Sequence, residues 1–181
     1  MVRVPQISSR DLLPESERHN FDAIAESRGR VGGPFAVLLN SPDVAGRIAH
    51  VGTYLRFETS LAPQQRELAI IATAREWDCA LEWGAHVPLA RNEGVSEAAI
   101  EVVGKREAAD GLAAAERLIV QCVRELVRDH RVSHETFETA HGALGDRGVT
   151  DLIATVGYYG MLACALNAFE VPPADGAVPL P

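Results

Sequence analysis

Hydrophobic positions recur every three or four residues along most of the chain, which is the period of an α-helix. Alternation with a period of two is rare, and runs of β-branched residues are short, so strands are not expected. Eight helices are predicted, and they begin near residues 14, 42, 63, 79, 97, 112, 134 and 151. Eight helices with short connections predict an all-α bundle.

Capping residues and prolines set the expected helix ends. Proline follows Ser41, and Pro63 opens the third helix in the same way. Asp78 is predicted to cap a fourth helix that runs from Cys79 to about Glu93 and is closed by Gly94. Ser96 and Ser133 are expected to cap the fifth and seventh helices, and Thr150 or Asp151 to open the eighth.

The predicted organisation has three parts. Residues 1–32 form an N-terminal helical extension and a glycine-rich linker, residues 33–170 the main domain, and residues 171–181 an extended proline-rich tail. The apolar stretch at 152–168 is shorter than the roughly 20 residues that cross a bilayer. Because this helix is apolar nearly all round, it is expected at the centre of the bundle or at a subunit interface.

Composition argues against several classes of function. The 181 residues hold 25 acidic and 17 basic side chains, so the net charge of -8 disfavours nucleic acid and anionic membranes as partners. Cys79, Cys122 and Cys164 lie too far apart in sequence for a zinc site or a disulfide framework. The N-terminus lacks the apolar core of a signal peptide, so a cytoplasmic location is expected.

Candidate chemistry gathers at the start of the fourth predicted helix. At 100° per residue, Cys79, Glu82 and His86 fall within an arc of about 60° beside apolar positions. Partial burial of such a trio shifts pKa values. Glu67 on the preceding helix is expected to reach the same site if the two helices pack as a hairpin.

The ionisation of Cys79 is open at this stage. Helix N-terminal N–H groups and a protonated His86 favour the thiolate, whereas the charge of Glu82 opposes it. Cys122 and Cys164 lie on apolar faces and are expected to be inert core residues.

Two further residues are candidates for substrate binding. Trp83 adjoins the polar arc on its apolar side, and His50 lies in the second predicted helix. Core packing for Trp83 and a surface role for His50 are the alternatives. The other histidines at 130, 134 and 141 are expected at the surface, and no metal site or cofactor is predicted.

The pattern of Glu67, Cys79-x-x-Glu82-x-x-x-His86 and the following LARNEGVSEAAIEVV resembles the carboxymuconolactone decarboxylase family, which includes AhpD-type alkylhydroperoxidases. The resemblance covers residues 33–170 and implies an AhpD-like helical bundle that assembles as a homotrimer or homohexamer. AhpD-like members carry Cys-x-x-Cys at this helix start. Here Glu82 replaces the second cysteine, which weakens the expectation of a hydroperoxidase cycle, because that cycle needs two thiols.

The resemblance implies an enzyme with a small-molecule substrate and no cofactor. We expect proton transfer or decarboxylation on a small organic acid, lactone or enolisable carbonyl compound, with His86 as acid or base and Glu82 or Glu67 as its partner. Cys79 would be a second proton carrier or part of the pocket wall. The first alternative is hydroperoxide reduction by Cys79, a peroxiredoxin activity. The second is a non-catalytic binding or assembly protein, which a closed contact around Glu82 and His86 would favour.

Overall fold

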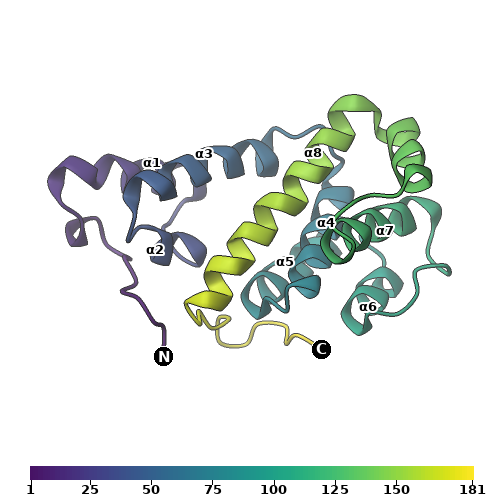
Figure 1. The fold of residues 1–181 in the computed structure, drawn as a ribbon. Helices are drawn as coiled ribbons and strands as arrows, with labels where there is room; N and C mark the ends of the chain where they lie inside the picture. Colours follow the sequence, from purple (N-terminus) through teal and green to yellow (C-terminus); the bar gives the residue numbers. More distant parts are fainter. The chain divides into compact units, whose positions relative to one another are not determined.

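The computed structural model describes residues 1–181 and is entirely helical (Figure 1). It confirms the predicted all-α class with eight α-helices and no strand. The α-helices are α1 (Arg18–Arg28), α2 (Pro34–Leu38), α3 (Pro42–Phe57), α4 (Pro63–Glu76), α5 (Ala80–Asn92), α6 (Glu97–Lys105), α7 (Ala114–Arg128) and α8 (His134–Ala168); short 3-10 turns span Arg10–Leu12 and Glu15–Glu17.

Several helix ends follow local sequence chemistry. Proline occupies the first turn of α3 and of α4, where its fixed φ suits the helix and its missing N–H costs nothing. The Ser96 hydroxyl accepts a hydrogen bond from the Ala99 N–H at 3.0 Å and so caps α6 as predicted. Gly94 follows α5 with a φ of 85°, a conformation that glycine adopts without strain.

Two predicted boundaries are wrong. Cys79, not Asp78, is the N-cap of α5, because Asp78 has a φ of 48° and its carboxylate binds Arg75 and Arg106 instead of a helix N–H. The expected seventh and eighth helices form α8 with a break at Gly145, where φ is 68° and ψ is 178°, and not at Thr150 or Asp151. Asp151 lies inside the helix, and its side chain binds the loop before α4.

The chain forms two compact units. The first contains residues 1–58 and 164–172. In it α1 and α2 pack against α3 around a hydrophobic cluster that includes Ile24, Phe35 and Leu39. The division of the sequence at residues 32 and 170 stays a prediction.

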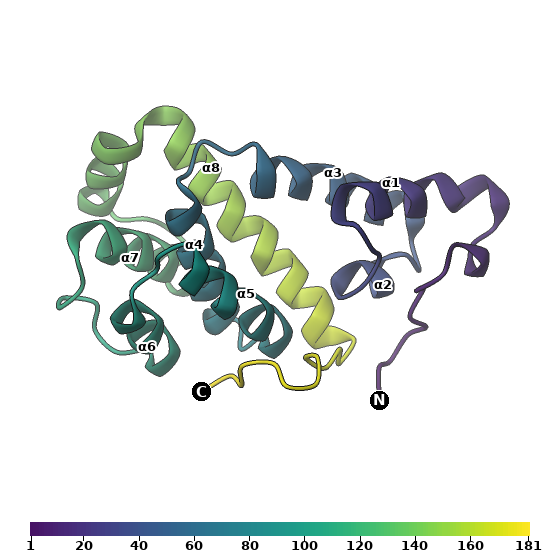
Figure 2. The ribbon, with the colours of Figure 1, turned by 180° about the vertical axis from the view of Figure 1, so that it is seen from behind.

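The second unit contains residues 59–163 and 173–181. Helix α4 is its centre and packs against α5, α6 and α7, as the view from behind also shows (Figure 2). Every residue from Glu67 to Arg75 is buried, because α4 has neighbours on all sides. Helix α7 buries one face that contains Ile119, Cys122 and Val123, which confirms the prediction that Cys122 is a core residue.

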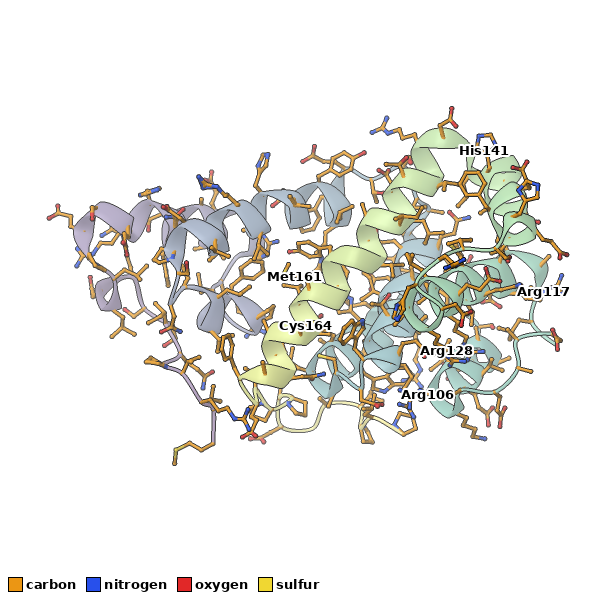
Figure 3. The ribbon with its side chains drawn as sticks, viewed as in Figure 1. Arg106, Arg117, Arg128, His141, Met161 and Cys164 are labelled. Atoms are coloured by element: carbon orange, nitrogen blue, oxygen red, sulfur yellow. The ribbon has the colours of Figure 1, made fainter.

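Helix α8 is the longest apolar element of the chain. By length and composition it is the one helix that could cross a membrane, with a mean hydropathy of 1.4 over the best window. However, 61% of that window is buried inside the protein, as in the core helix of a folded domain. Cys164 on α8 is exposed, so the prediction of a core position for Cys164 is wrong (Figure 3).

Candidate active site

The turn between α4 and α5 sets the register of the two helices that carry the site. The Cys79 N–H donates to the Ala74 carbonyl at 2.8 Å, which closes the turn directly after α4. The Asp78 carboxylate binds Arg75 in the same turn and Arg106 after α6. Because these contacts hold the turn, α5 returns along α4 and the two helices pack together.

Three ionisable side chains meet between α4 and α5. His86 Nδ1 lies 2.7 Å from Glu67 Oε2, and His86 Nε2 lies 3.4 Å from Glu82 Oε2. All three residues are at most 4% exposed. We call Glu67, Glu82 and His86 the His86 cluster. The sequence predicts that Cys79, Glu82 and His86 converge and that Glu67 reaches them. Glu67, Glu82 and His86 do meet, while the catalytic roles of all four residues stay predictions.

The His86 cluster favours a protonated imidazole. Burial alone lowers the pKa of His86, but hydrogen bonds to Glu67 and Glu82 together with their negative charges outweigh burial and raise the pKa above its ordinary value. The tighter contact, to Glu67, holds Nδ1–H and therefore orients the ring. The contact of Nε2 with Glu82 is longer, so the proton on Nε2 is more mobile than the proton on Nδ1.

Two residues that sequence reasoning missed complete the surroundings of His86. The ring of Tyr159 on α8 meets the imidazole edge to face, with centroids 5.2 Å apart and planes at 84°. The Arg66 guanidinium donates to Glu67 Oε1 at 3.3 Å, on the oxygen that His86 does not use. The pair Tyr158-Tyr159 inside an apolar helix was the available signal, but only the packing of α8 shows which ring reaches the cluster.

Cys79 lies at the start of α5, the helix that carries Glu82 and His86, but it is not part of the His86 cluster. No hydrogen bond or ion pair joins Cys79 to His86, and the cysteine is fully buried. Burial, and secondarily the charge of Glu82, raise the pKa of the thiol to about 11, although the backbone N–H groups of Glu82 and Leu81 act in the opposite direction. The competition left open by the sequence therefore ends in favour of the protonated thiol.

The two predicted substrate-binding residues lie in different surroundings. Trp83 is 2% exposed, packs in the hydrophobic core, and donates its indole N–H to the Pro179 carbonyl of the tail at 3.0 Å. His50 is exposed on α3, in the other compact unit. Their roles in substrate binding stay predictions.

The His86 cluster joins three ionisable groups in one network. In the His86 cluster the imidazole itself occupies the place between the two carboxylates. An imidazolium flanked by two buried carboxylates can give a proton and recover it within one network.

Comparisons with known proteins agree with this architecture. Residues 42–125, which include α4 and α5, match the model of the carboxymuconolactone decarboxylase family. A search of curated proteins finds no match. Among solved structures, the chain is similar to an uncharacterized peroxidase-related protein with an alkylhydroperoxidase AhpD core from Ralstonia eutropha JMP134, with a TM-score of 0.77 and 20% identity over 98% of this chain and 97% of that one.

A second solved structure has the same fold. It is an uncharacterized peroxidase-related protein from Silicibacter sp. TM1040, with a TM-score of 0.74 and 17% identity over 96% of this chain and 94% of that one. At these identities the two structures establish the AhpD-like fold, which confirms the predicted architecture. The family match covers less than half of the chain but includes the helices that carry the His86 cluster, so over residues 42–125 the chain is similar to the carboxymuconolactone decarboxylase family.

Proposed function

We propose that the protein is a cofactor-free enzyme that transfers a proton to or from carbon, with His86 as the general acid and base. The observation that carries the proposal is the burial of one imidazole between two carboxylates, at 2.7 Å and 3.4 Å. The similarity of residues 42–125 to a family of enzymes supports catalysis. The substrate class is a small organic acid, a lactone or an enolisable carbonyl compound.

Decarboxylation illustrates how the His86 cluster would act. The bond between the carboxylate carbon and the adjacent carbon breaks, carbon dioxide leaves, and the electron pair stays on the carbon conjugated to a carbonyl group. The His86 imidazolium then gives its Nε2 proton to that carbon, and the resulting imidazole regains a proton from water by way of Glu82. Simple enolisation uses the same groups, with neutral imidazole as the base.

The two carboxylates have different tasks in this scheme. Glu67 holds Nδ1 at hydrogen-bonding distance and stabilises the positive charge of the ring, so it orients the acid. Glu82 faces Nε2 at a longer distance, which suits a group that exchanges protons with that atom. Glu67 is therefore a positioning residue, and Glu82 is a proton shuttle.

Hydroperoxide reduction through Cys79 is the first alternative. The names of the two structural neighbours, both peroxidase-related, are the observation in its favour. A thiol with a pKa of about 11 is deprotonated in roughly one molecule in 10⁴ at pH 7, so it is a poor nucleophile. Iodoacetamide labelling of Cys79 at pH 7 tests this alternative, and labelling faster than that of free cysteine would support it.

A non-catalytic binding or assembly protein is the second alternative. The near-complete burial of Glu82 and His86 favours it, because a catalyst must admit substrate to the imidazole. Hydrogen exchange at carbon separates this alternative from the proposed enzyme, since a protein without turnover exchanges no carbon-bound hydrogen.

Deuterium exchange tests the proposal on whole classes of substrate at once. The purified protein is incubated in D₂O with a panel of carboxylated lactones, β-keto acids and enolisable ketones, and products are examined by mass spectrometry for loss of carbon dioxide and for carbon-bound deuterium. The wild type is expected to label or decarboxylate at least one class, and a folded His86→Gln variant none. Equal labelling by the variant contradicts the role of His86.

We also propose that the protein is cytoplasmic and self-associates as a homotrimer or homohexamer. Ile153 is 38% exposed on α8, and Ala154, Gly157 and the half-buried Met161 lie on the same side of the helix. An uncovered apolar strip of this kind is typical of a subunit interface. Light scattering of the wild type and of Ile153→Glu tests self-association, and a monomeric wild type contradicts it.

A further inference from the structure

The tail follows a defined path over the second compact unit. Residues 173–181 belong to the same unit as α5 and α6. In both views the yellow tail runs beneath α5 towards α6 (Figures 1 and 2). It has no helical or strand structure, so its position depends on side-chain contacts and on a few hydrogen bonds to its backbone.

Two buried side chains bind the backbone of the tail. The Trp83 indole N–H donates to the Pro179 carbonyl at 3.0 Å, and Arg75 Nη2 donates to the main-chain oxygen of Pro181 at 3.1 Å. Val178 and Leu180 are partly buried and pack against the hydrophobic core. The docked segment, residues 177–181, is thus held by apolar contacts and by two hydrogen bonds from buried donors.

Glycines on α5 and α6 form the seat for the docked segment. A Cβ atom on Gly84 would lie 2.9 Å from Ala177 Cβ and 3.0 Å from the Val178 carbonyl oxygen. A Cβ atom on Gly104 would lie 3.0 Å from Pro181 Cγ. The missing side chains allow the tail to approach both helices closely, and any larger residue at Gly84 must displace the tail or the helix.

Helix α5 therefore lies between two sets of contacts. Glu82 and His86 face Glu67 and Tyr159, whereas Trp83 and Gly84 face the docked segment. Arg75 links the docked segment to the turn that starts α5, because its guanidinium binds Pro181 and also Asp78 in that turn. A small rotation or shift of α5 changes the separation of His86 Nδ1 from Glu67 on α4, whereas Glu82 moves with His86 because both lie on α5.

We infer that residues 177–181 are a positioning strap that holds α5 in the rotation at which His86 reaches Glu67 on α4. Trp83 is then a positioning residue that acts through the strap and not a substrate contact. The effect on turnover rests on the proposed function, whereas the effect on the titration of His86 does not. A cavity of about 310 Å³ remains beside the strap, lined by Trp83, Val87, Ile100 and Pro179 among others, so α5 has room to move when the strap leaves.

Gly84→Ala tests the strap with a single methyl group. Within a helix this change favours helix formation, so weaker docking of the tail is not expected to come from a weaker helix. The matched control is Gly142→Ala on α8, where a Cβ atom meets nothing within 4 Å. Nuclear magnetic resonance measures two quantities: the resonance of the Trp83 indole N–H, which reports its hydrogen bond to Pro179, and the titration of His86. Limited proteolysis measures release of the tail.

The expected result is specific to Gly84. Gly84→Ala moves the indole N–H resonance, exposes the tail to proteolysis, lowers the pKa of His86 as its contact with Glu67 loosens, and reduces kcat about tenfold with little change in KM. Gly142→Ala changes none of these. If the tail is released while the titration of His86 stays that of the wild type, the inference is overturned.

Two further variants keep the test decisive. If Gly84→Ala retains the tail, a chain that ends at Gly176 removes the docked segment outright, with circular dichroism as the check of folding. Trp83→Phe keeps the ring but removes the donor to Pro179, and is expected to give a smaller shift of the His86 titration in the same direction. An unaltered titration in the shortened, folded chain overturns the inference. A changed titration without any detectable turnover in the wild type refutes the proposed function but not the strap.

Discussion

Two groups of buried carboxylates in the second unit make a useful contrast. Glu67 and Glu82 share one titratable partner, the imidazole of His86. Glu116 accepts from the Ser96 N–H and hydroxyl, each at 2.8 Å. Asp151 accepts from the Ser60 N–H and hydroxyl, each at 2.7 Å. The burial is similar, but the donors are different in kind.

The difference in donors shows which buried carboxylates can take part in proton exchange, which burial alone does not reveal. Backbone N–H and hydroxyl donors keep their protons in the neutral range, so Glu116 and Asp151 stabilise a helix start and a loop without taking part in proton exchange. A buried imidazole gains and loses its proton near neutrality, so the carboxylates around it determine when it does so. Function is therefore indicated by the partner of a buried acid and not by its burial.

Loss of the imidazole is the largest expected effect. His86→Gln keeps a polar side chain of similar reach but removes the titratable group, so turnover is expected to fall by about 10³-fold, within the range known for general acid–base residues. The measurement is kcat on the substrate class found by deuterium exchange, with circular dichroism as the folding control. A folded variant that keeps half of the activity contradicts the role of His86.

Removal of the orienting carboxylate is the second effect. Glu67→Gln takes away a charge that raises the pKa of His86, so the imidazole loses its proton at a lower pH. Activity that requires the imidazolium falls as pH rises through this pKa, and the alkaline limb of the pH profile therefore moves to lower pH. We expect a decrease in kcat of about tenfold to a hundredfold at pH 7.

The pH profile and the titration of His86 by nuclear magnetic resonance check this prediction together. The matched control is Glu116→Gln, which changes a buried carboxylate that does not contact the imidazole. A profile of Glu67→Gln that coincides with that of the wild type would separate Glu67 from the acid–base function.

Loss of Glu116, a carboxylate with a structural role, tests the contrast between the two groups of buried carboxylates. Glu116→Ala leaves the Ser96 N–H and hydroxyl without their acceptor, so the free energy of unfolding is expected to fall by about 1–3 kcal/mol. The activity of the folded fraction stays at the wild-type level. Urea denaturation and kcat measure the two quantities, and a large loss of kcat at full folding would show that the contrast between the two groups is false.

The smallest effect is expected at the cysteine. Cys79→Ala removes a buried, protonated thiol, so kcat is expected to change by less than about threefold, with a modest loss of stability from the cavity. Peroxide consumption by the wild type is expected to be no faster than by the variant. A Cys79-dependent consumption of peroxide would support the hydroperoxidase alternative instead.

The comparison of prediction with structure shows which helix ends have local causes and which depend on residues distant in the sequence. Pro42, Pro63 and Ser96 start helices where expected, because a cap and a fixed φ act within one turn. Asp78 does not cap α5, because Arg75 and Arg106 take its carboxylate. Asp151 does not open a helix, because Ser60, far away in the sequence, binds its side chain. Sequence patterns cannot show which distant group competes for a polar side chain.

The features of the candidate site also fall into those with local causes and those with distant causes. The spacing of four residues between Glu82 and His86 on a helix is a property of the local sequence, and it places both side chains on one face wherever α5 lies. The pairing of His86 with Glu67, the protonation of Cys79 and the attachment of Trp83 to the tail arise only when separate segments pack together. Helical periodicity is set by neighbouring residues, whereas desolvation and charge coupling depend on which segments exclude water from one another.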